Sequence, residues 1–174
     1  MKAMELKPID SAEMIERVAE WLAQKENSQW LDFGDGQKAL TPTWLKMMTR
    51  SDRHVLRIFT SDDGEPIGVI ALGNIDHAFR TATVWAAIGD KRFARSGYGT
   101  RAVAEMLRFG FRELGLHAIN TWIVEHNHSV KIVNRLKFQH VGRQRQCHWI
   151  DGHPYDRLLF DLLASEFSEV ESQA

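Results

Sequence analysis

The segment Arg95-Ser96-Gly97-Tyr98-Gly99-Thr100 lies between a strand-like stretch and a long amphipathic helix. Gly97 and Gly99 lack a Cβ atom, so another group can approach the backbone closely. A helix N-terminus carries unpaired N–H groups and about half a positive charge, and Ser96 and Thr100 add hydroxyl donors. These residues suit a phosphate or pyrophosphate ligand, but they would equally suit a tight corner between strand and helix.

Four basic residues near this segment supply a local positive field in a chain whose net charge is −1. They are Lys91, Arg92, Arg95 and Arg101. The segment lacks the G-x-x-x-x-G-K-[ST] pattern of Walker loops. It also fails the dinucleotide pattern G-x-G-x-x-G, because Ala102 stands at the third glycine. A motif of the form [QR]-x-x-G-x-[GA] remains.

Hydrophobic periodicity and turn residues predict the elements that position this segment. Residues 10–24 predict a helix capped by Asp10 and Glu13, and Thr41-Pro42 predicts the start of a short helix. Two further helices are predicted at 99–114 and 129–138. Strands are predicted at 4–9, 54–60, 66–75, 81–89, 117–125, 140–150 and 154–164. We expect one domain over residues 1–174, with a frayed tail from about residue 165.

Three segments, in the right order, resemble the GNAT N-acetyltransferase superfamily, and most closely its ribosomal-protein N-terminal acetyltransferase branch. They are "IGDKRFARSGYGTRAV", "EHNHSVKIVNRLKF" and the closing "GRQRQCHWIDGHPYDRLLFDLLASEF". The resemblance implies the GNAT fold, an α/β (α+β) architecture. Its mostly antiparallel, twisted mixed sheet would have about seven strands, helices on both faces and splayed central strands. It also implies acetyl-CoA as the co-substrate.

In that family, backbone N–H groups of the loop bind the pyrophosphate of acetyl-CoA. Two departures from its pattern stand out: Ala94 replaces the opening Gln/Arg, with Arg95 next to it, and Lys137 replaces a glycine. The family's Asn falls at His126, with Asn127 adjacent. Carried over position by position, the residues implied to bind the cofactor are Ile88, Arg95, Ser96, Gly97, Tyr98, Gly99, Thr100, Asn127 and Ser129.

Direct transfer of an acetyl group to a primary amine needs a group that takes the amine proton and donors for the developing oxyanion. The resemblance implies that backbone N–H groups at Ala87 or Ile88 hold the oxyanion, and no covalent enzyme intermediate is required.

Glu125 and His126 are the candidate bases, at the end of the strand predicted to splay. The alternatives are a solvated carboxylate for Glu125 and a CoA contact for His126. Val133 stands where many relatives carry a Tyr general acid, so Tyr155 is considered as its replacement.

The acceptor pocket is expected beside the segment "QWLDFGDG", where Trp30, Asp32 and Asp35 would attract a cationic amine. Asp76 and His77, in the turn "NIDHAF", are further candidates. The alternatives are an ordinary acidic loop and a polar turn. The acceptor would be a protein N-terminus or a small amine such as an amino sugar.

A catalytically silent acyl-CoA-binding or regulatory domain is the alternative function, because Val133 and His126 depart from the family pattern. The balanced charge argues against general binding to nucleic acid or anionic membrane. The eight histidines lack metal-ligand spacing, so no metal is expected. Cys147 is the single cysteine, and the N-terminus has no signal-peptide pattern, so a cytoplasmic location is expected. Dimers are common in families of this kind.

Overall fold

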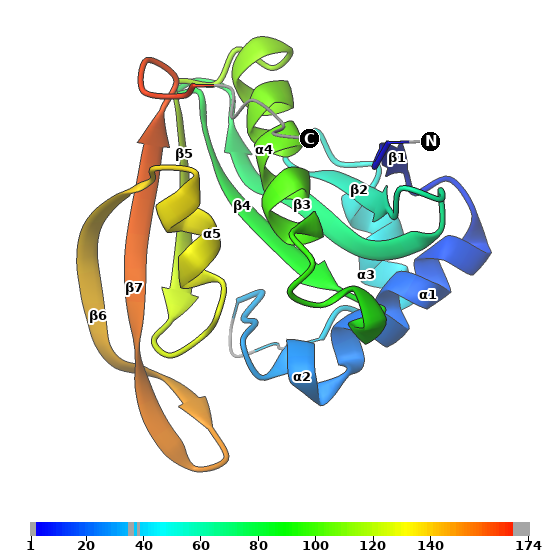
Figure 1. The fold of residues 1–174 in the computed structure, drawn as a ribbon, viewed down its shortest axis with the longest axis horizontal. Coiled ribbons are helices and arrows are strands. Elements are labelled where there is room, and N and C mark those ends of the chain that lie inside the picture. Colours follow the sequence, from blue (N-terminus) through cyan, green and yellow to red (C-terminus); the bar gives the residue numbers. More distant parts are fainter. Residues whose placement is uncertain (1–2, 35–36, 38, 169–174) are drawn as a thin grey trace.

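The computed structural model describes residues 3–34, 37 and 39–168, in which seven strands form one sheet with helices on both faces (Figure 1). The strand order is β1-β2-β3-β4-β5-β7-β6, and every neighbouring pair is antiparallel except β4 and β5. The predicted fold class is therefore confirmed. The strands are β1 (Leu6–Pro8), β2 (Val55–Thr60), β3 (Pro66–Asp76), β4 (Thr81–Ile88), β5 (Ala118–Val124), β6 (Gln139–Ile150) and β7 (His153–Leu163).

The helices agree with the prediction apart from two short additions. They are α1 (Ala12–Ala23), α2 (Lys25–Ser28), α3 (Pro42–Met48), α4 (Tyr98–Arg112) and α5 (Val130–Arg135). The sequence did not predict α2 or the 3₁₀ turn η1 (Lys91–Phe93). Thr41 caps α3 as expected, with its hydroxyl accepting from the Trp44 N–H at 3.3 Å.

The predicted capping box at the start of α1 is wrong by one residue. Ser11, whose backbone is still extended, is the N-cap, and its hydroxyl accepts from the Met14 N–H at 3.1 Å. A capping side chain belongs on the last non-helical residue. Asp10 therefore precedes the cap.

β3 lies at the centre of the packing because its side chains alternate between two hydrophobic clusters. Ile70 and Leu72 join the cluster under α4 and α5, whereas Val69 and Ala71 join the cluster under α1 and α3. This two-sided burial explains why β3 reads as a nearly continuous apolar run. The middle of the sheet is thereby fixed between the two helical layers.

β4 and β5 pair only at one end, and this parting creates the space for a site. Their parallel register covers only Thr81–Thr83 against Ala118–Asn120. Beyond that point β4 stays on β3 as far as Ile88, while β5 stays on β7 as far as Val124. Figure 1 shows the two strands diverging between α4 and α5. The predicted splay of the central strands is present.

The packed part of the chain extends beyond residue 165, where the sequence predicted fraying. The Phe167 N–H donates to the Leu163 C=O at 3.2 Å, and the Phe167 ring lies 5.3 Å from that of Phe111 on α4. Phe167 therefore closes the end of the α4 cluster. The rest of the predicted tail, residues 169–174, lies outside the described residues.

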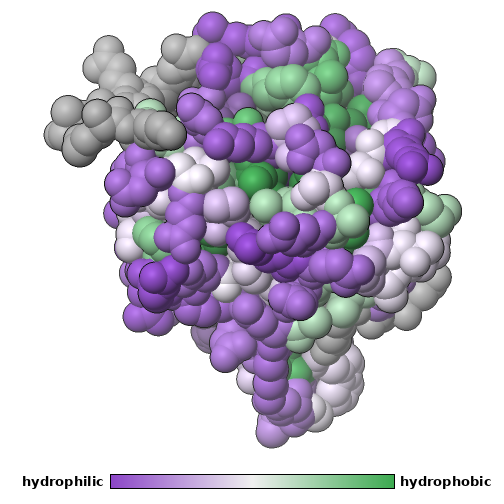
Figure 2. Space-filling model, turned by 90° about the vertical axis from the view of Figure 1, so that its right-hand side faces the viewer, coloured by the Kyte–Doolittle hydropathy of each residue, from purple (hydrophilic) through white to green (hydrophobic). Residues whose placement is uncertain are grey.

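The surface is largely hydrophilic on the side that carries β1 and α1. Figure 2 shows apolar residues there mainly in recesses between polar side chains. Within the described part of the chain, no helix is both long and apolar enough to cross a membrane.

We expect the substitution Gly68→Ala to destabilise the fold, because β3 passes close to its neighbours there. A Cβ at Gly68 would lie 2.2 Å from the Phe59 ring and 2.6 Å from the Ala87 carbonyl oxygen. Overpacking of this kind costs about 2–3 kcal/mol. Urea unfolding should show that loss for Gly68→Ala. The matched control is Gly142→Ala, whose Cβ would meet only the Leu159 side chain at 3.8 Å. Equal stability of the two variants would contradict the packing argument.

Candidate active site

A cavity of about 610 Å³ occupies the space between the diverging strands. Its walls come from both faces of the sheet, so it reaches through the parting of β4 and β5. On the side of α4 and α5 the lining residues are Val103, Ile132, Val133 and Phe138. On the side of α1 and α3 they include the segment 30–34, Trp44, Met48, His54 and Trp85.

The glycine-containing loop forms the N-terminus of α4 at one end of this parting. Gly97 is the N-cap, with φ of +86°, and Arg95 also has a positive φ of +64°. The first helical bond runs from the Arg101 N–H to the Gly97 C=O at 3.1 Å. The N–H groups of Tyr98 to Thr100 therefore precede the helical ladder and suit an anion.

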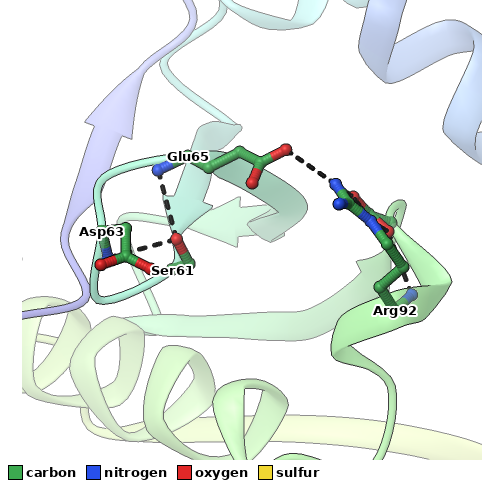
Figure 3. A network of polar contacts seen from close by, with 5 residues as sticks. Ser61, Asp63, Glu65 and Arg92 are labelled. Carbon is green, nitrogen blue, oxygen red and sulfur yellow. Dashed lines mark hydrogen bonds and ion pairs between the residues drawn. The ribbon is translucent and has the colours of Figure 1, made fainter.

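Two of the four basic side chains around this loop, those of Arg92 and Arg101, have carboxylate partners, so the predicted positive field is weaker than the sequence suggests. Figure 3 shows Arg92 reaching Glu65, at 2.9 Å, across a network that includes Ser61 and Asp63. The hydroxyl of Ser61 accepts from the N–H groups of Asp63 and Glu65, which fixes the hairpin. Arg92 also contacts Asp90. The Arg92 side chain thus joins η1 to the β2–β3 hairpin.

Tyr98 and Arg101 likewise face the β2–β3 hairpin. The Arg101 guanidinium contacts Asp62 at 2.8 Å and lies over the Tyr98 ring, 5.2 Å from its centre. The Tyr98 hydroxyl lies 3.2 Å from the Asp62 carboxylate. Tyr98 can therefore serve an anion only through its backbone N–H. Arg95, on the other hand, lies at the loop itself, 3.1 Å from His128.

Lys91 stabilises the end of β4 rather than the anion loop. Its ammonium donates to the Ile88 C=O at 2.7 Å and to the side-chain oxygen of Asn27 at 2.6 Å. Asn27 is buried and also donates to the Ile88 C=O, at 3.1 Å. Burial lowers the pKa of Lys91, against the opposing charge of Glu26.

The backbone of β4 offers N–H groups to the parting on every second residue. The Gly89 N–H donates to the Ile67 C=O at 2.8 Å, which makes that opposed pair a hydrogen-bonded one. Pairs alternate in an antiparallel ladder, and the register with β3 is regular here. The N–H of Ala87 therefore points to β3, whereas those of Ala86 and Ile88 point towards β5. Of the two residues predicted for the oxyanion, the geometry favours Ile88.

Asn127 and Ser129, which the resemblance implied to bind the cofactor, line the cavity. The Asn127 side-chain oxygen accepts from the Ser129 N–H at 2.9 Å, which fixes the turn before α5. Val133, one turn further, also lines the cavity and is 4% exposed. An apolar side chain thus stands where many relatives place a hydroxyl.

The three residues predicted to move protons lie outside the cavity lining. The carboxylate of Glu125 accepts from the Asp156 N–H at 2.9 Å and lies 3.3 Å from Arg143. His126 is exposed, and its ring packs edge-on against Tyr155 at 6.4 Å. Glu125 is therefore held by its neighbours.

Asp76 and His77 also lie away from the cavity lining. The Asp76 carboxylate accepts from the N–H groups of Ala78 and Phe79, at 2.9 and 2.8 Å. The exposed His77 ring lies 2.9 Å from the Asp52 C=O. These contacts fit the alternative of a polar turn.

Trp30 and Asp32 do line the cavity, but Asp32 is already paired. Its carboxylate accepts from Arg157 at 2.7 Å and from the Gly34 N–H at 2.9 Å. Partial burial acts to raise the pKa of Asp32, but these two hydrogen bonds and the charges of Arg157 and His148 outweigh it and lower the pKa. Asp35 lies outside the described residues.

Arg157 belongs to a polar network that the sequence analysis missed. The guanidinium lies 4.0 Å from the centre of the Trp122 ring and 3.0 Å from Nδ1 of His148. His148 is 2% exposed, and its Nε2 lies 2.7 Å from the Gln29 C=O. The network ties the segment from Gln29 to Asp32 onto β6 and β7. The signal available in the sequence was the presence of His148 and Arg157 within two predicted strands.

His54 is a second cavity residue that the sequence analysis missed. Among the described residues, its Nδ1 is the one buried side-chain polar atom without a hydrogen-bond partner. Nε2 is not enclosed in this way, so a bound molecule would reach the ring through Nε2. Burial, followed by the charge of Arg53, lowers the pKa of His54. No motif surrounds His54, so no local pattern could have singled it out.

Known proteins are similar to this chain in sequence and in fold. Residues 4–139 match a family described as "Acetyltransferase (GNAT) domain". An uncharacterised N-acetyltransferase, p20 of Bacillus licheniformis, is 28% identical over 112 residues, 64% of this chain and 62% of the relative. The chain thus matches less than two-thirds of that relative's length.

Two solved structures share the fold over almost the whole chain. Spermidine N-acetyltransferase from Vibrio cholerae, in complex with CoA and spermine, has a TM-score of 0.81 at 15% identity and covers 94% of this chain and 96% of its own. Ribosomal-protein-S5-alanine acetyltransferase from Vibrio fischeri has a TM-score of 0.76 at 17% identity and covers 97% of both chains.

The matching family model is that of an acetyltransferase domain, and the fold is one that the two solved acetyltransferases share. The chain belongs to the acetyltransferase (GNAT) domain family. The prediction of the GNAT family is confirmed. In the described part of the chain, no group of three or more His, Cys, Asp or Glu residues is placed to hold a metal ion.

We expect Arg157→Gln to destabilise the protein by about 1–2 kcal/mol, because it leaves Asp32 and His148 without their shared partner. Thermal unfolding measures this loss, and a double-mutant cycle with Asp32→Asn should give a coupling of the same order. The control is Lys25→Met, since Lys25 and Asp151 form a pair whose side chains are 68% and 65% exposed. Exposed pairs contribute about 0–1 kcal/mol. Zero coupling between Arg157 and Asp32 would contradict the network.

We expect His54 to contribute to the pH dependence of stability. Its folded pKa lies below the ordinary value of 6.5, so below that pH the unfolded chain binds the proton more readily and stability falls. His54→Gln should lose less unfolding free energy than the parent protein between pH 7.5 and pH 5.5. Urea titrations at the two pH values measure it. Parallel losses in both proteins would refute the assignment.

Proposed function

We propose that the protein is an acetyl-CoA-dependent N-acetyltransferase that passes the acetyl group directly to a primary amine. The observation that carries this proposal is the unpaired edge of β4, which runs beside the cavity towards the N-terminus of α4. One surface thus offers donors for a pyrophosphate, for an extended amide chain and for a thioester carbonyl. Acetyl-CoA has these three parts in that order.

The pyrophosphate would lie against the N–H groups that begin α4, with Ser96, Thr100 and Arg95 beside it. Asn127 and Ser129 would border the arm of the cofactor from the side of α5. Support comes from the Vibrio cholerae structure, which holds CoA in the same fold. Tyr98 would contribute its N–H alone, because its hydroxyl is directed to Asp62.

The thioester would be activated by the strand itself. The N–H groups of Ala86 and Ile88 point into the parting, where they could bind the arm of the cofactor and the oxyanion that forms when the amine attacks. Such preorganised donors are the largest single contribution in many acyl transfers. The tetrahedral intermediate then breaks its C–S bond, and the thiolate leaves.

His54 is the residue that we assign to the amine proton. It lines the cavity, is kept neutral by burial and offers Nε2 as acceptor when its own proton is on Nδ1. The amine proton would move to Nε2 as the C–N bond forms. Asp32 is a poorer base, because Arg157 already holds its carboxylate. Glu125, His126 and Tyr155 would act only through water or on the cofactor side.

A silent acyl-CoA-binding domain is the alternative, favoured by Val133 in the cavity wall. It predicts binding of acetyl-CoA without release of free thiol in the presence of any amine. We also propose a cytoplasmic location, from the single cysteine. A homodimer remains our proposal for the assembly.

The decisive experiment is calorimetric titration of the protein and of Gly97→Glu with acetyl-CoA. A carboxylate at Gly97 would stand where the pyrophosphate binds, so the Kd should rise about a hundredfold, roughly 2.7 kcal/mol. Gly115→Glu is the matched control. Both glycines have a positive φ and open space where a Cβ would lie, but Gly115 is at the other end of α4. The Kd of Gly115→Glu should match that of the parent protein.

If the parent protein did not bind acetyl-CoA, the proposed function would be wrong. Equal weakening in both variants would point to general strain in α4 and would remove the loop from the cofactor site.

A further inference from the structure

The part of the cavity that faces α1 and α3 is walled by aromatic side chains. We name this part the aromatic chamber; its walls are Trp30, Phe33, Trp44, Trp85 and Trp122. Phe33 packs edge-on against Trp85, with ring centres 5.1 Å apart. Trp44, at 51% exposure, lies where the chamber meets solvent. Rings of this size bury large apolar areas when a ligand covers them.

Among the described residues that line the chamber, the one formally charged side chain is already paired. Asp32 is the one carboxylate among its described lining residues, and these include no Lys or Arg. Arg157 neutralises Asp32 at 2.7 Å while lying over the Trp122 ring. Each ammonium group of a polyamine would lose its water here without gaining a free carboxylate, at a cost of several kcal/mol per ion. The chamber is therefore a poor site for a polycation.

Several hydrogen-bonding side chains of the lining are already engaged. Thr83 donates to Asn120 at 2.8 Å, Thr121 donates to the Val84 C=O at 2.8 Å, and Gln37 donates to the Ala39 C=O at 3.0 Å. A ligand rich in hydroxyl groups would leave several of them unpaired, which costs free energy at each one. An amino sugar is thereby disfavoured.

The imidazole of His54 is suited to a single nitrogen at the inner end of the chamber. His54 lies beside Gly73, where a Cβ would be 3.4 Å from its Nδ1 and 3.8 Å from Nε1 of Trp85. Gly73 pairs with Thr83, the last residue of β4 that still pairs with β5. His54 thus lies close to the point where the strands part, at the inner end of the chamber.

We propose that the acceptor is a primary monoamine on an apolar, ring-sized body, which packs against the walls of the aromatic chamber and presents its nitrogen towards His54. This proposal rests on the N-acetyltransferase function proposed above. The apolar body supplies the binding free energy, and the amine need not bring a charge that the chamber cannot pair.

The test compares four amines with acetyl-CoA: phenethylamine, spermidine, glucosamine and a peptide with an N-terminal alanine. Release of free CoA thiol gives kcat/KM for each. Binding of phenethylamine is followed separately, through the fluorescence of the chamber tryptophans. We expect kcat/KM for phenethylamine to exceed the others by about tenfold or more, the discrimination that an apolar pocket can supply.

Two variants and a control link the preference to the chamber. Trp44→Ala and Trp85→Leu should raise KM for phenethylamine about tenfold and leave the Kd of acetyl-CoA unchanged. Trp149→Ala, on β6 at a residue with 57% exposure, removes the same type of side chain away from the cavity lining and should change neither value.

The outcomes separate this proposal from the function on which it rests. Faster turnover of spermidine, glucosamine or the peptide would overturn the acceptor class while keeping the transferase. Phenethylamine binding that neither Trp44→Ala nor Trp85→Leu weakens would overturn the chamber as its site. Acetyl-CoA binding without thiol release from any amine would overturn the transferase function and this acceptor class with it.

Discussion

The parting of β4 from β5 is the constraint on which the rest of the structure depends. A strand that keeps one neighbour and loses the other exposes a row of N–H and C=O groups, and such groups are costly inside a protein unless they are paired. The structure pairs two of these carbonyls with its own side chains. Thr121 donates to the Val84 C=O, and both Asn27 and Lys91 donate to the Ile88 C=O. The N–H groups on the same edge are the ones left for a ligand.

This pairing of the β4 edge explains residues that otherwise look misplaced. Asn27 is buried and Lys91 is partly so because both serve the end of β4. Arg92 and Arg101, close to an anion loop, are turned to the β2–β3 hairpin and hold it against α4. The positive potential of the loop therefore comes from its backbone N–H groups and from the N-terminus of α4. Of the four basic residues that the sequence predicted to surround the loop, Arg95 is the one whose side chain stays beside it. Backbone donors hold their geometry better than long side chains.

The sequence predicted much of this fold, because its signals are local. The apolar run from Val69 to Leu72, the Thr41-Pro42 start of α3 and the Gly97 start of α4 are each signals that depend on neighbours in the chain. The proposed cofactor side could be read from the sequence for the same reason, since one loop supplies most of it. The contacts of the proposed acceptor side could not. Arg157 meets Asp32 across 125 positions, and His54 reaches the cavity only because the start of β2 lies beside β3.

The absence of a tyrosine at Val133 can be reconciled with catalysis by asking which proton is harder to move. A thiol has an ordinary pKa of about 8.5, so a thiolate is a tolerable leaving group near neutral pH even without a positioned acid. The attacking amine must instead lose a proton to become an amide, and a positioned base contributes about a hundred- to ten-thousandfold to such a step. With Val133 in place of a tyrosine, the less demanding of the two proton transfers has no positioned acid. The valine side chain also adds apolar surface to the cavity wall. A neutral imidazole at His54 addresses the more demanding one. The departure from the family pattern is thus compatible with an active enzyme whose acceptor site, rather than its cofactor site, carries the acid–base group.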